Sequence, residues 1–353
     1  MKIAISCCTP YHIFNAINLK INKYSDSEMD IFICNHFLNS KEIFKNVKES
    51  NIFKNVYYIE DLNRSSFIYK KMVWLKCYNG IFDKRNKRYD MFCFSSYSAF
   101  NISIASYLKQ KFNSEVVFVE DGFITYTKEY ESNYGWFKMK LGKIFNIFNK
   151  NIIDKYMVYN TNLICFETNR YIDEIPIIKK EDINFLKLND IFEVDENINK
   201  FQKYKYIFFD QKFDSLISSE LKASIIKEVL NYINKNNVII KSHPRECLKV
   251  ESEVEYYNST IPWELISFRN NFDNKVFISF TSTACFTNTL IFNSYAIIIL
   301  LHKLINYTER TGDYKFELFI NKVKQNNNVE IYEPSSIQEL GEIIKMIEHK
   351  HYV

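Results

Sequence analysis

The feature that most constrains the fold is an alternation of short apolar runs with amphipathic segments along most of the 353-residue chain. In the first half, the strand candidates are Lys2–Cys7, Asp30–Cys34, Val56–Ile59, Met91–Phe94 and Val116–Glu120, with helical patterns such as Pro10–Lys20 and Ser98–Lys109 between them. Two further apolar runs, DKYMVY and NLICFE, extend the series to residue 167. Strands that alternate with helices favour βαβ units and parallel sheets.

The alternation stops at 168–203, where charged residues become frequent, and we interpret this range as an inter-domain linker. A second α/β series follows, with KYIFFDQ, the helix SSELKASIIKEVLNYI, NVIIKSHPRE, KVFISFTSTA and YAIIILLHK. The last segment, SSIQELGEIIKMIEHK, has a serine cap and apolar residues at helical spacing. We therefore expect an amino-terminal domain at 1–167, a carboxyl-terminal domain at 204–335 and a terminal helix at 336–353. The expected fold class is α/β, with two doubly wound domains that face a cleft.

Composition and charge exclude several classes of protein. With 47% hydrophobic and 25% charged residues, the chain is typical of a folded globular protein. The net charge of +4 is mild, and no concentrated basic stripe suggests a nucleic-acid partner. The eight cysteines form no C-x-x-C pair, which favours buried thiols in a reducing compartment. Because no signal-peptide pattern and no apolar run of spanning length is present, we expect a cytoplasmic protein.

The glycines are few, and their positions are restrictive. Only six occur, at 80, 122, 135, 142, 312 and 341, so neither GxGxxG nor GxxxxGK can be written. This excludes the usual dinucleotide-binding fingerprint and the P-loop. A bound phosphate would have to be held by side chains and helix amino termini instead.

One segment has two open interpretations. The stretch WFKMKLGKIFNIFNK, at 136–150, combines aromatic and aliphatic residues with four lysines. A basic amphipathic helix can lie on a membrane surface. A core helix with a solvated lysine face has the same pattern, and we favour it because such helices are common in globular proteins.

Four loops with chemically useful side chains share one position, at or just after the carboxyl end of an expected strand. They are CTPYH (8–12), EDG (120–122), SHPRE (242–246) and FTSTA (280–284). In open α/β sheets, ligands bind beyond the carboxyl ends of the strands. Each loop alone has an ordinary structural explanation, such as a solvated turn, a packed histidine or a helix cap. Their shared position is what indicates a site.

These loops supply two kinds of chemistry. Glu120 and Asp121 offer a base that can take a proton from a hydroxyl. His243 and Arg245, with the hydroxyls of 281–283 at a helix amino terminus, offer a site for an anion such as phosphate. A base in one domain and a phosphate site in the other suit group transfer from a nucleotide donor.

The order of these motifs resembles that of a known group of enzymes. EDG, HP and FTST are similar to the D/E-D/E-G, His-Pro and Ser/Thr motifs of bacterial sialyltransferases. The chain resembles glycosyltransferase family 52, the capsule and lipooligosaccharide sialyltransferases, which are related to the marine-type and polysialic acid enzymes. CCTPYH is similar to the opening strand and loop of that family, and IPWELI (261–266) to its segment with a nucleoside-binding glutamate.

The resemblance implies a GT-B fold, with two Rossmann-like domains, and an inverting, metal-independent transfer of sialic acid from CMP-sialic acid to a bacterial surface glycan. It implies that Asp121 is the base, although Glu120 stays open because adjacent residues of a strand point to opposite faces. His243 would bind or protonate the departing CMP phosphate, and Glu264 would hold the ribose or cytosine. The other expected donor-binding residues are Thr9, Gly122, Pro244, Arg245, Thr281, Ser282 and Thr283, and Tyr11 and His12 are candidates on the acceptor side.

No metal or other cofactor is expected, and the chain contains no Asp-x-Asp motif. The expected partners are a nucleotide-sugar donor and an oligosaccharide acceptor, and a homodimer and peripheral contact with the inner face of the cell membrane stay open. Two alternative functions remain. The first is a GT-B transferase that uses another nucleotide sugar, such as a UDP-hexose. The second is a non-catalytic subunit that binds a glycan or a nucleotide sugar.

Overall fold

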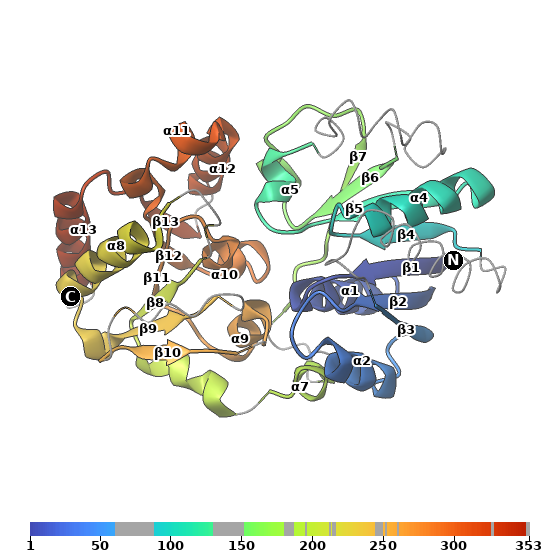
Figure 1. Ribbon diagram of the computed structural model, residues 1–353, viewed down its shortest axis with the longest axis horizontal. Helices are drawn as coiled ribbons and strands as arrows, with labels where there is room; N and C mark the ends of the chain where they lie inside the picture. Colours follow the sequence, from blue (N-terminus) through green and yellow to red (C-terminus); the bar gives the residue numbers. More distant parts are fainter. Residues whose placement is uncertain are drawn as a thin grey trace. The chain divides into compact units, whose positions relative to one another are not determined.

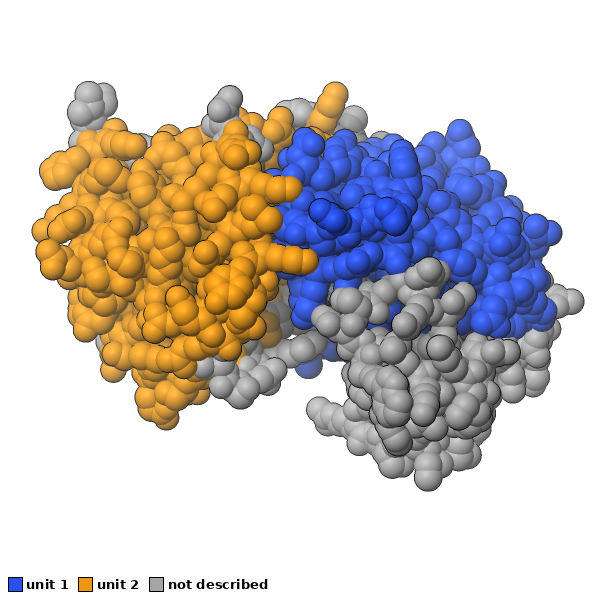
Figure 2. All heavy atoms as spheres, turned by 90° about the horizontal axis from the view of Figure 1, so that it is seen from above, with its two compact units in different colours: residues 1–176, 182–193 blue, residues 177–181, 194–353 orange. Residues whose placement is uncertain are grey.

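The computed structural model describes residues 1–60, 88–129, 152–179, 187–194, 196–211, 213, 217–243, 250, 253–259, 261–325 and 328–350. The chain forms two compact units (Figures 1 and 2). Unit 1 comprises Met1–Pro176 and Asp182–Glu193, and unit 2 comprises Ile177–Glu181 and Val194–Val353. Each unit is built around one parallel sheet.

Unit 1 contains a seven-stranded sheet in the order β3-β2-β1-β4-β5-β6-β7 (Figure 1). Its strands are β1 (Lys2–Cys7), β2 (Glu28–Cys34), β3 (Asn55–Ile59), β4 (Met91–Phe94), β5 (Glu115–Val119), β6 (Lys155–Val158) and β7 (Tyr171–Glu174). Its helices include α1 (Pro10–Asn22), α2 (Ser40–Glu49), α4 (Ala99–Phe112), α5 (Ile124–Thr127), α7 (Lys187–Phe192) and the 3-10 turn η3 (Thr161–Leu163). The strand order reverses between β1 and β4, as in doubly wound folds.

Local sequence explains where the helices of unit 1 begin and end. The Thr9 hydroxyl accepts the backbone N–H of His12 at 3.2 Å, and Pro10 occupies the first turn of α1. Ser98 caps α4 in the same way, and Asn113 ends that helix in the left-handed region, with φ 55°. The central strands are buried on both faces, which accounts for their continuous apolar runs.

Unit 2 contains a six-stranded parallel sheet in the order β10-β9-β8-β11-β12-β13. Its strands are β8 (Tyr206–Phe209), β9 (Val238–Lys241), β10 (Glu255–Tyr257), β11 (Val276–Ser279), β12 (Ala296–Leu300) and β13 (Val329–Tyr332). Its α-helices include α8 (Ser219–Tyr232), α9 (Trp263–Arg269), α10 (Thr287–Leu290), α11 (Tyr307–Thr311), α12 (Tyr314–Lys324) and α13 (Ile337–Lys350). The 3-10 segments include η5 (Glu196–Lys203), η6 (Lys235–Asn237), η7 (Thr283–Phe286) and η8 (His302–Ile305). Here the order reverses between β8 and β11.

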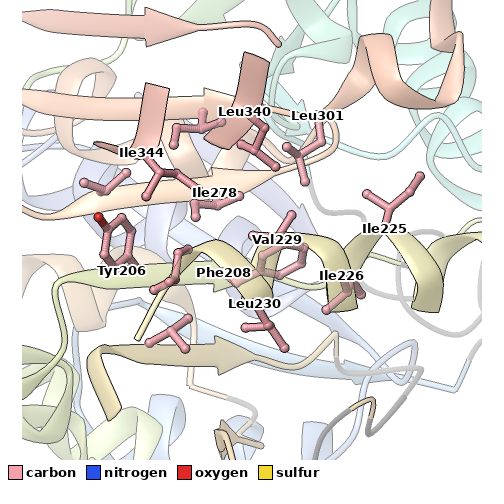
Figure 3. Close-up of a cluster of buried hydrophobic side chains, with 14 of the residues drawn as sticks. Tyr206, Phe208, Ile225, Ile226, Val229, Leu230, Ile278, Leu301, Leu340 and Ile344 are labelled. Carbon is pink, nitrogen blue, oxygen red and sulfur yellow. The ribbon is translucent and has the colours of Figure 1, made fainter. Parts of the chain in front are cut away.

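Helices α8 and α13 pack together in the core of unit 2 (Figure 3). Val229 of α8 and Leu340 and Ile344 of α13 are buried in one cluster with strand residues such as Phe208. Gly341 leaves room for the Tyr232 ring of α8, because a Cβ at this position would lie 2.4 Å from the present position of that ring. The terminal helix is therefore an integral part of this core.

The structure confirms the predicted strands of the first half and differs in one run. NLICFE is not a strand, because the Asn160 side chain accepts the Asn162 N–H at 3.0 Å and caps the turn η3. Cys165 then donates its N–H to Tyr126 O at 2.7 Å, so this apolar stretch is buried without joining the sheet. The last strand of the sheet is β7, which lies inside the range 168–203.

Over the described ranges, no helix is both long enough and apolar enough to cross a membrane. The segment 136–150 lies outside the described residues. Its two interpretations, as a membrane-surface helix or a core helix, remain expectations.

Candidate active site

The two acids that follow β5 have opposite environments. The side chain of Glu120 is buried, whereas that of Asp121 is 37% exposed. Side chains alternate between the two faces along extended backbone, which separates these neighbours. Solvent can therefore reach the carboxylate of Asp121 but not that of Glu120.

The carboxylate of Glu120 accepts hydrogen bonds from three groups of unit 1. Tyr11 Oη of α1 donates to Oε1 at 3.1 Å, and Tyr126 Oη of α5 donates to Oε2. The backbone N–H of Tyr159, after β6, also donates to Oε2, at 2.9 Å. Burial raises the pKa of Glu120 to about 7, although these three hydrogen bonds oppose the rise. Glu120 thus links three elements, and the Tyr11 hydroxyl, a candidate for the acceptor side, is bound to it.

We predict that Glu120→Gln makes stability less dependent on pH. The folded pKa of about 7 lies above that of an ordinary glutamate, so the folded protein binds this proton more tightly than the unfolded chain. This contribution to stability is complete below about pH 4.5 and is lost as the pH rises through about 7. Urea unfolding at pH 5.0 and pH 7.5 should therefore give a smaller difference in the variant than in the wild type. An equal difference between the two pH values in variant and wild type would contradict a raised pKa for Glu120.

Asp121 is held by contacts to its backbone and to one carboxylate oxygen. His12 Nε2 lies 2.8 Å from Oδ1, and the Asp121 N–H donates to Thr125 Oγ1 at 2.8 Å. The following residue, Gly122, has φ 76°, a conformation that other residues rarely adopt. The glycine is thus required by the turn that directs the chain from β5 into α5.

Residues of the CTPYH loop contribute to the hydrogen bonds around Asp121. His12, a predicted acceptor-side residue, has a side chain that is only 1% exposed and contacts Asp121. Thr9, a predicted donor-binding residue, caps α1 with its hydroxyl. The loop after β1 and the loop after β5 are thus connected within unit 1.

In unit 2, the Ser/Thr loop after β11 is held by a residue that the sequence analysis missed. Gln211, after β8, accepts the Thr281 N–H at 2.7 Å and the Ser279 hydroxyl at 3.0 Å through Oε1. Its Nε2 donates to Thr281 Oγ1 at 3.2 Å. These bonds join the two strands at which the strand order reverses, where α/β sheets bind ligands.

A buried ion pair supports Gln211. Lys222 Nζ lies 2.7 Å from Asp210 Oδ1, and both side chains are 2% exposed. The same lysine donates to Gln211 O at 2.5 Å, and Gln211 donates its N–H to Asp210 Oδ1 at 2.9 Å. Removal of either charge would leave the other buried and unpaired, which is strongly destabilising.

The helix expected after FTSTA is shorter than the sequence suggested. Ser282 does act as a cap and accepts the Ala284 N–H at 3.3 Å. The 3-10 turn η7 comes next, then the four-residue helix α10, after which Asn293 adopts a left-handed conformation with φ 50°. So short a helix has little macrodipole, so an anion at this loop would depend on side-chain hydroxyls such as those of Ser282 and Thr283.

The other predicted donor residues lie near the end of β9. His243 follows this strand and is half-buried, while Pro244 and Arg245 lie outside the described residues. Burial raises the pKa of Glu264, in the first turn of α9, to about 7, with Lys241 and a hydrogen bond to Thr287 opposing the rise. Burial also lowers the pKa of Lys241 to about 8. Lys241 is thus buried and Glu264 half-buried, and the two groups are electrostatically linked.

Two doubly wound parallel sheets in successive units define a GT-B fold, which confirms the predicted fold class. Solved structures with this architecture include spinosyn rhamnosyltransferase SpnG complexed with thymidine diphosphate, which is 8% identical with a TM-score of 0.53 over 99% of this chain and 91% of that chain. UGT89C1 from Arabidopsis thaliana complexed with UDP-L-rhamnose is 9% identical, with a TM-score of 0.52 over 97% and 88% of the two chains. Sucrose-phosphate synthase from Thermosynechococcus elongatus is 9% identical, with a TM-score of 0.50 over 100% and 99%.

At these identities, the likeness concerns the fold alone. No protein-family model matches the sequence, and no curated protein matches it.

Proposed function

We propose that the protein is an inverting, metal-independent glycosyltransferase that moves sialic acid from CMP-sialic acid to a hydroxyl of a bacterial surface glycan, in capsule or lipooligosaccharide synthesis. The observation that carries the proposal is the accessible carboxylate of Asp121 beside the buried, fully bonded Glu120. The GT-B fold and the order of the EDG, HP and FTST motifs support a nucleotide-sugar donor, and their resemblance to sialyltransferases supports CMP-sialic acid.

In this reaction Asp121 is the general base. Its carboxylate takes the proton of the acceptor hydroxyl as the oxygen attacks the anomeric carbon of sialic acid. The bond from that carbon to the CMP phosphate breaks, and its electron pair leaves with the phosphate oxygen. A single displacement of this kind inverts the configuration at the anomeric carbon.

Unit 2 supplies the donor site in this proposal. The hydroxyls of Ser282 and Thr283 bind the CMP phosphate, and His243 binds or protonates it as it departs. Glu264 holds the ribose or cytosine. Groups that already face a developing negative charge need no reorganisation during the reaction and are therefore effective.

We predict that Gln211→Ala weakens donor binding. Gln211 fixes the amide and hydroxyl of Thr281 and so shapes the loop proposed to bind phosphate. The KM for the donor should rise about tenfold, with kcat changed less. A displaced loop would lose roughly one or two hydrogen bonds to the donor phosphate, and this loss weakens binding by about that factor. Steady-state kinetics would measure this, with the exposed Gln338→Ala as the matched control. An unchanged donor KM would contradict a role for Gln211.

The donor class can be tested by ligand-induced stabilisation. A nucleotide that binds the folded protein raises its melting temperature. We expect CMP to raise it more than UDP or thymidine diphosphate at equal concentration. A larger shift with UDP would contradict the CMP-sialic acid assignment and favour the UDP-hexose alternative. If no nucleotide shifted the melting temperature, the donor site itself would be contradicted.

A further inference from the structure

We infer that His12 is a positioning residue for Asp121. Its imidazole holds Oδ1 of the Asp121 carboxylate, so that Oδ2 receives the proton of the acceptor hydroxyl. The inference rests on the proposed function, because it assigns a role within the same site. It concerns atoms that are all within unit 1.

The difference in burial between His12 and Asp121 determines which of the two can contact the substrate. The His12 side chain is 1% exposed, whereas that of Asp121 is 37% exposed, and His12 Nε2 and Asp121 Oδ1 are 2.8 Å apart. An acceptor hydroxyl can reach the carboxylate but not the imidazole. His12 therefore acts through Asp121 and does not itself take the substrate proton.

The first turn of α1 fixes the orientation of the imidazole. The backbone N–H of Cys8 donates to His12 Nδ1 at 3.1 Å, so this nitrogen is the acceptor of the ring. The ring proton consequently lies on Nε2 and is donated to Asp121. Thr9 holds the backbone of the same residue through the helix cap. The imidazole is thus held at Nδ1, the nitrogen away from Asp121, and the backbone of His12 is held by the helix cap.

The carboxylate has one bound and one available oxygen. Oδ1 is bonded to His12, and the Asp121 backbone is held by Thr125. Within the part of the chain that the structure describes, no protein group bonds to Oδ2. During transfer, the acceptor oxygen forms its bond to the anomeric carbon, its proton passes to Oδ2, and CMP leaves with the electron pair of the broken bond. His12 keeps its own proton throughout.

The hydrogen bond also restricts rotation of the carboxylate, because Oδ1 stays beside Nε2 of a ring that is itself held in place. The other titratable groups that face the pair are Glu120, Cys8, and the Cys34 and His36 side chains that interact with Cys8.

The test compares His12→Phe with His12→Gln. His12→Phe should lower kcat about 100-fold, with donor KM within about twofold, because the donor that holds Oδ1 is lost. His12→Gln should keep kcat within about tenfold of the wild type, because its amide can donate to the same oxygen. The control is His302→Phe, which replaces an equally buried histidine of unit 2 and should change neither quantity.

A second readout needs no turnover. A crystal structure of His12→Phe should show the Asp121 carboxylate turned from its wild-type position, whereas His12→Gln should keep it in place. An unmoved carboxylate in His12→Phe, or a lower melting temperature with an unchanged kcat, would overturn the inference. If the wild type released no nucleotide from any donor, the proposed function would fail, and the position of the carboxylate would still decide the role of His12.

Discussion

Asp121→Asn should abolish sialyl transfer while leaving the protein folded. The loss in kcat is expected to be about 1000-fold, because a positioned general base contributes roughly 10²–10⁴-fold. Asparagine keeps the shape of the side chain and can still accept the hydrogen bond from His12 through its Oδ1. The loss would therefore report the missing basic oxygen and not a disturbed site. CMP release in the presence of acceptor measures the rate, and circular dichroism verifies the fold.

Glu120→Gln is the matched control, since it removes the same charge from the adjacent residue. The substituted side chain would lie in the same position, bonded by Tyr126 and by the Tyr159 N–H, and away from the substrate. We expect its kcat to stay within about tenfold of the wild type. If Glu120→Gln were inactive and Asp121→Asn active, the base would be Glu120, and the assignment made from side-chain exposure would be wrong.

His243→Ala should lower kcat by about 10²–10³-fold, because a donor aimed at developing negative charge has an effect of this size. In the proposed reaction His243 meets the phosphate of CMP as it departs, so the loss should appear in kcat more than in the acceptor KM. Kinetics with CMP-sialic acid would measure it.

The control for His243 is His349→Ala, which removes an exposed histidine from the last turn of α13. It should leave kcat unchanged. A normal kcat with a lower melting temperature in His243→Ala would show that His243 is a packed structural residue.

The central strands could be predicted from the sequence because both faces of a parallel sheet are covered. Met91–Phe94, for example, is buried at every position and reads as a continuous apolar run. The strands that the sequence analysis missed, β7, β10 and β13, lie at the edges of the two sheets and are partly exposed. Their sequences therefore lack the apolar run that identifies a buried strand.

The candidate site was predictable in position but not in its contacts. Parallel strands bring their carboxyl ends to one edge, so the sequence could place the CTPYH and EDG loops at the same edge of one sheet. The bond between His12 and Asp121 joins residues 109 apart in the chain, and it depends on the direction of the first turn of α1. No local pattern encodes that direction.

Two features of unit 2 could not be predicted from the sequence: the role of Gln211 and the length of the helix after FTSTA. Gln211 is a single polar residue after a strand, and only its spatial contact with Thr281 reveals its role. The helix after FTSTA ends early, because Thr289 bonds to the carbonyl of Ser294 and Asn293 is left-handed, although the cap at Ser282 follows the expected pattern. Local propensity indicated where this helix begins, and tertiary contacts determined where it ends.

The most direct measurement of the proposed function is nucleotide release by the purified protein, with CMP-sialic acid and then with UDP-sugars, in the presence of EDTA. We predict CMP release from CMP-sialic acid that requires no metal ion and is lost in Asp121→Asn. Release from a UDP-sugar alone would contradict the sialyltransferase assignment while leaving the GT-B fold unaffected. CMP release that persisted at the wild-type rate in Asp121→Asn would contradict the role of Asp121 as the base.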